Sequence, residues 1–430
     1  MTVLTPVVFL FLILAGTPIV FALGVSAAII LWLSEVPMSI IAQRIYAGLD
    51  SFTIMAIPFF VFAGIIMEQG GIARRIIDFA TALVGWVRGS LLLVAVVSGT
   101  GLAAISGSGS ADTAASSSIM LPEIRRRGYN IDFAAGIMAA SGSLGPIIPP
   151  SIMMVVLATI SNLSVGGMFL GGIIPGLMMA AGLLLACYLH ARREDAKGNA
   201  AYRITERFTL QRLGQTFVAA LPAFAMPVII VGGIVGGVFT PTEAASVAVF
   251  VGLFIGLFIY REITIKRLPE LILRAAAVSA AVMMIIATAS IFSWLIASQN
   301  IPALLGEQLR TITDSPYGFL LIINILLLLI GMFMESISAI LILTPVLMPI
   351  ALSFGIDPLH FGVIIVMNLS IGMITPPYGI TLFVASSIAE RSITQVSAKI
   401  GMPLGFMLCA LLAATYFPAL ITFLPNTLMR

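Results

Sequence analysis

Long apolar runs separated by short polar stretches fill most of the chain. Several runs reach or exceed the roughly 20 residues that a helix needs to span a bilayer, and all are longer than the roughly 9–11-residue alternating strands of an outer-membrane barrel. The runs lie near 3–33, 51–67, 131–160, 168–190, 215–238, 240–260, 275–297, 316–333, 359–389 and 403–424. This pattern predicts an all-α polytopic membrane protein.

The composition supports this interpretation and excludes other classes of protein. Of the 430 residues, 60% are hydrophobic and only 9% are charged, whereas a soluble domain carries about 25% charged residues. A soluble enzyme and a nucleic-acid-binding protein are therefore excluded. The two histidines and two cysteines lie apart in the chain, and none of the lysines follows a glycine. We therefore expect no transition-metal site, no Walker A loop and no enzymatic activity.

Two further apolar segments, 89–121 and 331–353, are interrupted by glycine, serine and proline. Basic residues flank the first segment at both ends. They belong to a set of 18, out of 21 basic residues in the chain, that is expected in loops on one side of the membrane. By the positive-inside rule these loops are cytoplasmic, so 89–121 enters and leaves on the same side as a re-entrant hairpin. The second segment has no basic flank. It predicts a hairpin over about 318–353 that enters from the outer side.

The two hairpins belong to a sequence repeat with an offset of 227 residues. The residue types recur at this offset in four places: Pro122 and Pro349, Gly128 and Gly355, Gly145 and Gly372, and the pairs Pro149-Pro150 and Pro376-Pro377. After each hairpin we expect a helix that is broken at the proline pair, over 131–160 and 359–389. Because the flanking charges of the copies differ, the repeats are predicted to have inverted topology. The first repeat is then 1–190, the basic cytoplasmic linker 191–214 and the second repeat 215–430.

The first apolar run, 3–33, could be one long helix or two short helices broken at Gly16-Thr17-Pro18. The second repeat offers a guide, because the apolar stretch 222–260 is divided by Thr240-Pro241-Thr242. By analogy we expect two helices in 3–33 and an N-terminus on the outer side.

Polar residues interrupt the apolar pattern at each hairpin tip and at each helix break. The tips are 106–113 and 335–338, and the breaks are 141–150 and 372–377. Each proline lacks an N–H and leaves one carbonyl without its helical partner, which is costly at membrane depth unless something binds it. Such oxygen ligands suit a small hard cation such as Na⁺. We expect two cation sites, one in each repeat; close packing of small residues is the alternative explanation.

Three acidic residues lie deep in apolar segments: Asp112, Glu243 and Glu335. Intramembrane carboxylates are candidates for function, but each of them could instead cap a helix. For Glu243, which follows Thr240-Pro241, the structural role at a helix start is favoured. No lysine or arginine falls in the membrane core. An anionic substrate would therefore be held by helix N-termini, hydroxyl groups and the bound cations.

The order of short motifs along the chain resembles that of the large membrane subunit of tripartite ATP-independent periplasmic (TRAP) transporters. These motifs are Ala56-Ile57-Pro58-Phe59-Phe60, Gly70-Gly71-Ile72-Ala73-Arg74-Arg75, Ile105-Ser106-Gly107-Ser108 with Ala111-Asp112, Gly145-Pro146-Ile147-Ile148-Pro149-Pro150-Ser151, Phe239-Thr240-Pro241-Thr242-Glu243-Ala244-Ala245 and Ile374-Thr375-Pro376-Pro377. The resemblance implies an elevator-type transporter, in which a scaffold holds a mobile transport domain with both hairpins. It also implies import of a carboxylate, such as a C4-dicarboxylate or sialic acid, driven by a Na⁺ gradient across the bacterial inner membrane.

The resemblance further implies partners and site residues. The partners are a small four-helix membrane subunit, a periplasmic substrate-binding protein and membrane lipid, with no nucleic acid. The first Na⁺ site maps to Ser106, Ser108, Ser110, Gly142 and Gly145, and the second to Gly331, Glu335, Ser336, Ser338, Gly372, Thr375 and Pro376. The substrate is expected beside Ser108, Asp112, Pro149, Pro150, Ser336 and Pro377. The alternatives are a stand-alone divalent-anion/Na⁺ symporter without a binding protein, and an integral-membrane enzyme or scaffold.

Overall fold

The computed structural model describes residues 4–203 and 207–429, and within these ranges the regular structure is entirely helical. The helices are α1 (Leu4–Leu14), α2 (Ile19–Leu33), α3 (Ser39–Leu49), α4 (Ala56–Gln69), α5 (Ile72–Val84), α6 (Ser90–Ser106), α7 (Gly109–Arg126), α8 (Ile131–Gly142), α9 (Ile152–Ile160), α10 (Val165–Ala196), η1 (Ala200–Tyr202), α11 (Leu210–Val235), α12 (Pro241–Phe254), η2 (Ile255–Ile259), η3 (Ile265–Arg267), α13 (Leu268–Ser298), α14 (Ile301–Ile312), α15 (Pro316–Gly331), α16 (Ser336–Ser353), α17 (Pro358–Gly372), α18 (Ile380–Ile388), α19 (Ile393–Ser397), α20 (Gly401–Tyr416) and α21 (Ala419–Leu428).

Several of these helices can cross a membrane. Within the described chain, α10, α11, α12 with η2, α13 with η3, and α16 are each long and apolar enough for a full span. Three bent pairs, α4–α5, α14–α15 and α20–α21, pass the same test together. The protein is therefore an all-α, multi-pass membrane protein, which confirms the predicted fold class.

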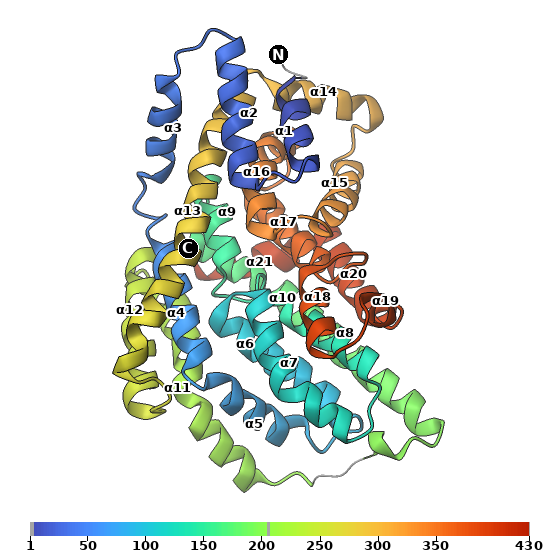
Figure 1. Cartoon of the computed structure of the whole chain (residues 1–430). Coiled ribbons are helices and arrows are strands. Elements are labelled where there is room, and N and C mark those ends of the chain that lie inside the picture. Colours follow the sequence, from blue (N-terminus) through green and yellow to red (C-terminus); the bar gives the residue numbers. More distant parts are fainter. Residues whose placement is uncertain (1–3, 204–206, 430) are drawn as a thin grey trace.

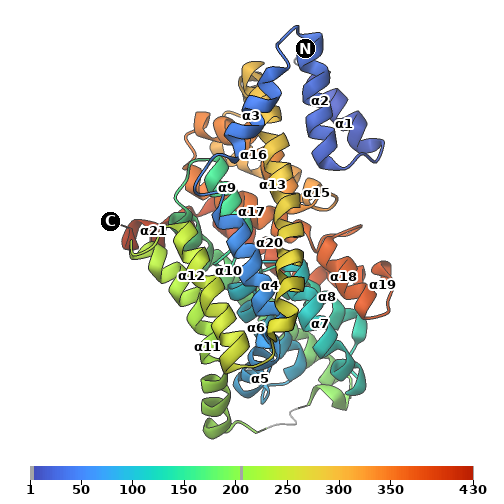
Figure 2. The same cartoon turned by 60° about the vertical axis from the view of Figure 1, so that its left-hand side comes forward.

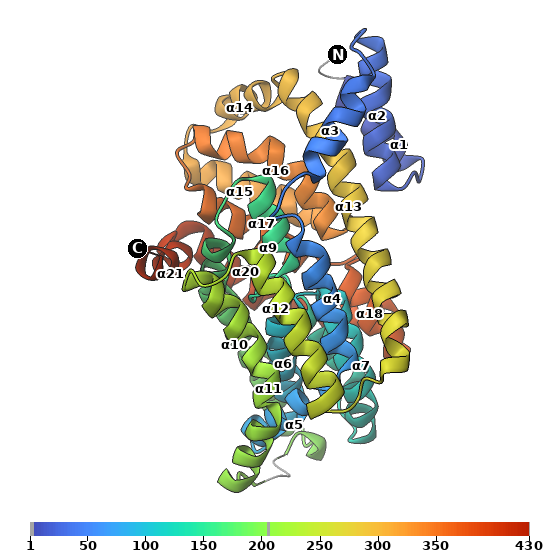
Figure 3. The ribbon, with the colours of Figure 1, turned by 90° about the vertical axis from the view of Figure 1, so that its left-hand side faces the viewer.

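The helices form two groups (Figures 1 and 2). The scaffold group comprises α1–α4 and α11–α13, in which the long helix α13 lies against α2, α3 and α4, and α4 packs on α12. The hairpin group comprises α6–α10 and α15–α21. Two amphipathic helices, the arms α5 and α14, lie between the groups at opposite ends of the molecule (Figure 3). The arm α5 packs on α11 and α6, and the arm α14 packs on α13 and α16.

Glycine and proline set the breaks in the scaffold group. The run 3–33 is two helices, as the analogy with the second repeat predicted, because Gly16 adopts a φ of +82° and Pro18 precedes α2. The stretch 222–260 is divided in the same way before α12. There Thr240 and Glu243 form a capping box, in which each side chain accepts the backbone N–H of the other residue. This confirms the structural interpretation of Glu243.

Two sets of elements of the same kind make up the core of the hairpin group. The first is the hairpin α6–α7 followed by the broken helix α8–α9, and the second is the hairpin α15–α16 followed by the broken helix α17–α18. The hairpins approach the middle of the molecule from opposite ends, α6–α7 from the end that carries α5 and α15–α16 from the end that carries α14 (Figures 1 and 3). Both breaks contain a cis proline pair, Pro149-Pro150 and Pro376-Pro377.

The two sets interlock. The helix α9 packs on α16 and α17, whereas α18 packs on α7 and α8. The second half of each broken helix therefore lies against the hairpin of the other set. This exchange ties both hairpins and both breaks into one packed unit.

The basic loops gather at the end of the molecule that carries α5. The predicted linker 191–214 is helical at both ends, because α10 continues to Ala196 and α11 begins at Leu210. Charge pairs accompany this extension: Asp195 lies 3.2 Å from Arg88 and 3.4 Å from Arg203. The side chain of Tyr202 is fully buried, and its hydroxyl accepts the backbone N–H of Asn130.

Candidate functional site

The first hairpin tip holds a cluster of oxygen atoms. The α6 helix ends at Ser106, Gly107 turns the chain with a φ of +63°, and Ser108 caps α7. The Ser106 hydroxyl donates to Oδ1 of Asp112 at 2.5 Å and accepts the backbone N–H of Ser108 at 3.0 Å. The other carboxylate oxygen of Asp112, Oδ2, is buried and has no hydrogen-bond partner in the described part of the chain. This oxygen is therefore available to a ligand.

The break between α8 and α9 lies directly against this tip. A Cβ atom at Gly145 would stand 3.0 Å from Oδ2 of Asp112, and one at Gly142 would overlap the side chain of Thr113. On the other side of the turn, a Cβ at Gly107 would lie 2.7 Å from the carbonyl oxygen of Pro150. Glycine is required at these positions because any side chain would separate the tip from the break.

The second hairpin tip is organised by Glu335. This residue caps α16, and its carboxylate accepts the backbone N–H groups of Ile337 at 3.0 Å and Ser338 at 2.8 Å, together with the Ser338 hydroxyl. The capping role that the sequence left open for Glu335 is therefore its role here. The neighbouring Ser336 is buried, and its hydroxyl has no hydrogen-bond partner among the described residues.

The break between α17 and α18 lies against the second tip. A Cβ at Gly372 would stand 2.6 Å from Cα of Gly331, so the two backbones are in direct contact. The Gly379 N–H donates to the carbonyl oxygen of Met332 at 3.3 Å. The Thr375 hydroxyl, in the break, donates to the Ile371 carbonyl in the last turn of α17.

The structure brings most of the candidate residues into these two clusters. Ser106, Ser108, Asp112, Gly142, Gly145 and Pro150 meet at the first tip, and Gly331 and Gly372 meet at the second. Ser110 lies half-buried in the first turn of α7, and Pro149 is buried in the break. Pro376 is half-buried and Pro377 exposed, and both lie in the second break.

The two clusters are neighbours. Met373, which directly follows α17, reaches the first tip: a Cβ at Gly109 would stand 2.9 Å from the Met373 Cε and 3.2 Å from the carbonyl oxygen of Gly142. Both hairpin tips and both breaks therefore converge near one point in the molecule. Groups of three or more histidine, cysteine or carboxylate side chains that could hold a metal ion are absent from residues 4–203 and 207–429.

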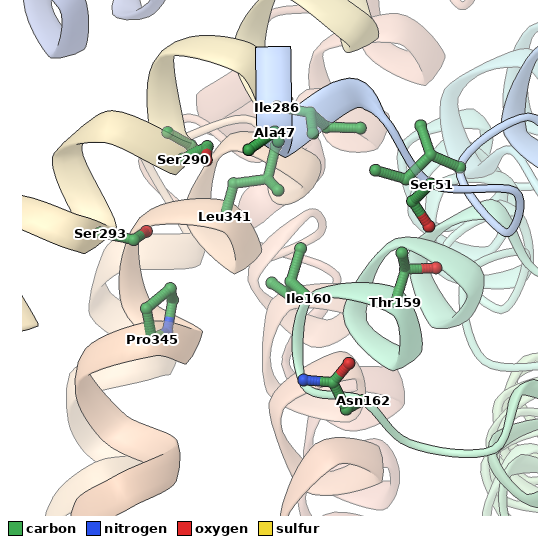
Figure 4. Close-up of a pocket in the computed structure, with 13 residues that line it drawn as sticks. Ala47, Ser51, Thr159, Ile160, Asn162, Ile286, Ser290, Ser293, Leu341 and Pro345 are labelled. Atoms are coloured by element: carbon green, nitrogen blue, oxygen red, sulfur yellow. The ribbon is translucent and has the colours of Figure 1, made fainter. Parts of the chain in front are cut away.

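A polar cavity of about 330 Å³ separates the scaffold group from the hairpin group. Figure 4 shows its lining: Ser290 and Ser293 come from α13, Ser51 follows α3, Thr159 and Asn162 lie at the end of α9, and Pro345 belongs to α16. Small and polar side chains thus occur on both walls, together with the apolar side chains of Ile54, Ile160, Ile286 and Leu341. No motif in the sequence indicates this cavity, since its residues are far apart in the chain.

A second cavity, of about 130 Å³, lies beside the first hairpin tip. It contains Ser106 and Ser108 together with Glu68 of α4 and Arg274 of α13. In the sequence, Arg274 is one of the 18 basic residues in the loops of one side, and neither it nor Glu68 stands in a recognisable motif.

Comparison with known proteins gives consistent results. A family model described as "Tripartite ATP-independent periplasmic transporter, DctM component" matches residues 7–420. Over 432 residues the chain is 39% identical to the C4-dicarboxylate TRAP transporter large permease protein DctM of Rhodobacter capsulatus, and 97% of each chain is covered. It is 41% identical over 417 residues to the isethionate TRAP transporter permease protein DctMQ of Oleidesulfovibrio alaskensis, with 96% of this chain and 65% of that protein covered. The fold is similar to that of the YdaH transporter of Alcanivorax borkumensis in its crystal structure, with a TM-score of 0.63 and 14% identity over 90% of this chain and 88% of that one.

Proposed function

The chain belongs to the DctM family of TRAP transporter components, and from this membership we propose that it is the permease subunit of a Na⁺-driven importer of an organic acid. Its relatives are transporter permeases, and the chain is not an enzyme. One observation carries the proposal. Two polar hairpin tips face two broken helices at the centre of an otherwise apolar protein, and oxygen atoms there lack partners within the described chain.

These oxygen atoms support the proposed coupling to Na⁺. At the first tip, Oδ2 of Asp112 is buried and has no hydrogen-bond partner in the described chain, and Gly145 of the break lies against it. A buried polar atom without a partner costs roughly 1–3 kcal/mol, so a bound cation would stabilise this arrangement. Like other hard cations, Na⁺ binds oxygen ligands. The bound cations would in turn offset the negative charge of the substrate, and they travel with it as cargo.

An elevator motion fits the interface between the two groups of helices. The hairpin group is one interlocked unit, whereas the interface with the scaffold group includes a cavity of about 330 Å³ lined by small and polar residues. Small sliding movements of packed helices past one another are the shear type of motion, and the small side chains among the lining residues would favour it. We propose that the hairpin group moves along α4 and α13 and carries the substrate across the membrane.

The substrate and the partners are proposed from the family. A C4-dicarboxylate, a related carboxylate such as sialic acid, or another small organic acid would be delivered by a periplasmic binding protein to a transporter in the bacterial inner membrane. A small membrane subunit would cover part of the scaffold group. The exposed apolar side chains of α11 and α12, including Val228, Phe250 and Phe254, offer a face for that subunit or for lipid.

Uptake by proteoliposomes tests the proposal. The chain is reconstituted with its small subunit, the binding protein is added outside, and uptake of radiolabelled succinate is measured with external NaCl and with choline chloride. We expect uptake only with NaCl. Equal uptake in both salts would refute the coupling. Undiminished uptake without the binding protein would favour the alternative, a stand-alone symporter.

A further inference from the structure

The cavity beside the first hairpin tip joins a charged pair of the scaffold group to the polar tip. Its lining includes Ser106 and Ser108 from the tip, Gly64 and Glu68 from α4, and Arg274 from α13. Glu68 and Arg274 are the two charged residues that line it in the described part of the chain. Among the described residues, the guanidinium group of Arg274 therefore shares this cavity with Ser108, which is expected beside the substrate, and with Ser106, which is expected at the first Na⁺ site.

Arg274 also borders a second space. A cavity of about 290 Å³ is lined by Arg274 together with Gln69, Glu262, Arg267 and Glu270, which lie at the end of the molecule that carries the basic loops. Arg274 thus stands between the hairpin tip and the open end. An anion that moves from the first cavity towards the second would meet its guanidinium group.

The pairing of Arg274 leaves it able to exchange partners. Its Nη2 atom lies 3.4 Å from Oε1 of Glu68, and about half of the Arg274 side chain is exposed. A well-formed charge-assisted hydrogen bond between such groups is shorter, about 2.7–2.9 Å. The planar guanidinium fork can hold a carboxylate with two parallel hydrogen bonds, and Glu68 uses only part of this capacity.

We propose that Arg274 binds the carboxylate of the substrate on the cytoplasmic side, with Glu68 as the internal competitor that returns it to solution. This rests on the proposed function, because it concerns the release step of the same importer. Arg274 belongs to the scaffold group and the substrate moves with the hairpin group. The contact therefore exists only when the tip lies beside α13, as it does here. Arg274 sets the affinity for substrate on the inside, and the outer affinity is independent of it.

The test separates the two sides of the membrane. Proteoliposomes of the complete transporter receive binding protein only outside, so that one orientation is active. The external KM for succinate is measured, and so is the internal succinate concentration that halves initial uptake. For Arg274→Gln we expect the internal constant to rise on the order of tenfold or more, since hydrogen bonds to charged groups contribute about 1.5–3 kcal/mol. The external KM should stay within about twofold.

Three further variants distinguish substrate contact from a structural ion pair. Lys266→Gln removes the same charge nearby but lines neither cavity, and it should leave both constants unchanged. Glu68→Gln frees Arg274 and should lower the internal constant several-fold. The double variant Glu68→Gln/Arg274→Gln should remain as weak as Arg274→Gln. If the double variant regains the wild-type constant, or if Lys266→Gln matches Arg274→Gln, the inference is wrong. Na⁺-independent uptake by the wild type would contradict the proposed function alone, because both constants are still measurable.

Discussion

The hydroxyl of Ser370 donates a hydrogen bond to the backbone carbonyl oxygen of Ser143, and the two residues are 227 positions apart. This separation equals the offset at which the prolines and glycines of the two halves recur. Ser143 and Ser370 are thus equivalent positions of the repeat, one at the start of the first break and one near the end of α17. Equivalent residues can touch one another only where the two halves cross, so the contact marks the point about which the hairpins and breaks are arranged.

Loss of this contact should destabilise the protein. In Ser370→Ala the buried carbonyl of Ser143 loses its side-chain donor, which costs roughly 1–3 kcal/mol. We expect a lower unfolding temperature for the purified protein in detergent. The matched control is Ser386→Ala, because the buried Ser386 hydroxyl donates only to Leu382 in its own helix. Equal unfolding temperatures of the two variants would show that the contact contributes nothing beyond an ordinary helical serine.

The second hairpin should tolerate no side chain where it meets its break. In Gly372→Ala the new methyl group would stand 2.6–2.9 Å from backbone atoms of Gly331, which cannot rotate away. Overpacking of this kind costs about 1–3 kcal/mol and would lift the tip from the break. We expect a marked loss of uptake and a lower unfolding temperature. Gly401→Ala is the control, since a methyl group there meets no atom within 4 Å. A fully active Gly372→Ala variant would contradict the close docking.

Local residue chemistry explains why the breaks could be predicted. The conformational effects of Gly16-Thr17-Pro18 and of the two proline pairs act within a few residues, so the sequence alone indicates where a helix stops. The helix α3 and the arm α14 were not predicted, because they mix polar and apolar residues and fall below the hydropathy of a span. The extension of α10 to Ala196 was missed for a related reason. Its last turns carry charges that are paired only in the folded chain, such as Asp195 with Arg88.

The site was predictable only where one hairpin meets its own break. Ser108, Asp112 and Gly145 stand in recognisable polar interruptions, and the fold brings them together. The cavity shared by Ser106 with Arg274 could not be foreseen. It depends on how α13 lies across the cavity from the first hairpin tip, which is far from it in the chain. Nothing in the local sequence of Arg274 distinguishes it from the basic residues that only flank a span.

The carboxylate of Asp112 should govern the affinity for Na⁺. Asp112→Asn keeps the shape of the side chain but removes the charge from the buried oxygen cluster at the first tip. We expect the Na⁺ concentration for half-maximal uptake to rise on the order of tenfold, because a hard cation prefers a charged oxygen ligand. The control is Glu243→Gln, which alters an acidic residue that only caps α12 and should retain the Na⁺ dependence of the wild type. An unchanged Na⁺ dependence in Asp112→Asn would remove this carboxylate from the cation site.

The contact between α4 and the first tip should control access to the state described by this structure. A Cβ at Gly64 would stand 3.2 Å from the carbonyl oxygen of Ser106, across the boundary between the scaffold and hairpin groups. Gly64→Val would push the tip away from α4 without disturbing the packing inside either group. We therefore expect uptake to fall on the order of tenfold while the unfolding temperature stays near that of the wild type. Gly232→Val on α11 is the control, since a Cβ there meets no atom within 4 Å. Normal uptake by Gly64→Val would show that the tip does not need this position during transport, and a large fall in unfolding temperature would show that the two groups are fixed together rather than sliding.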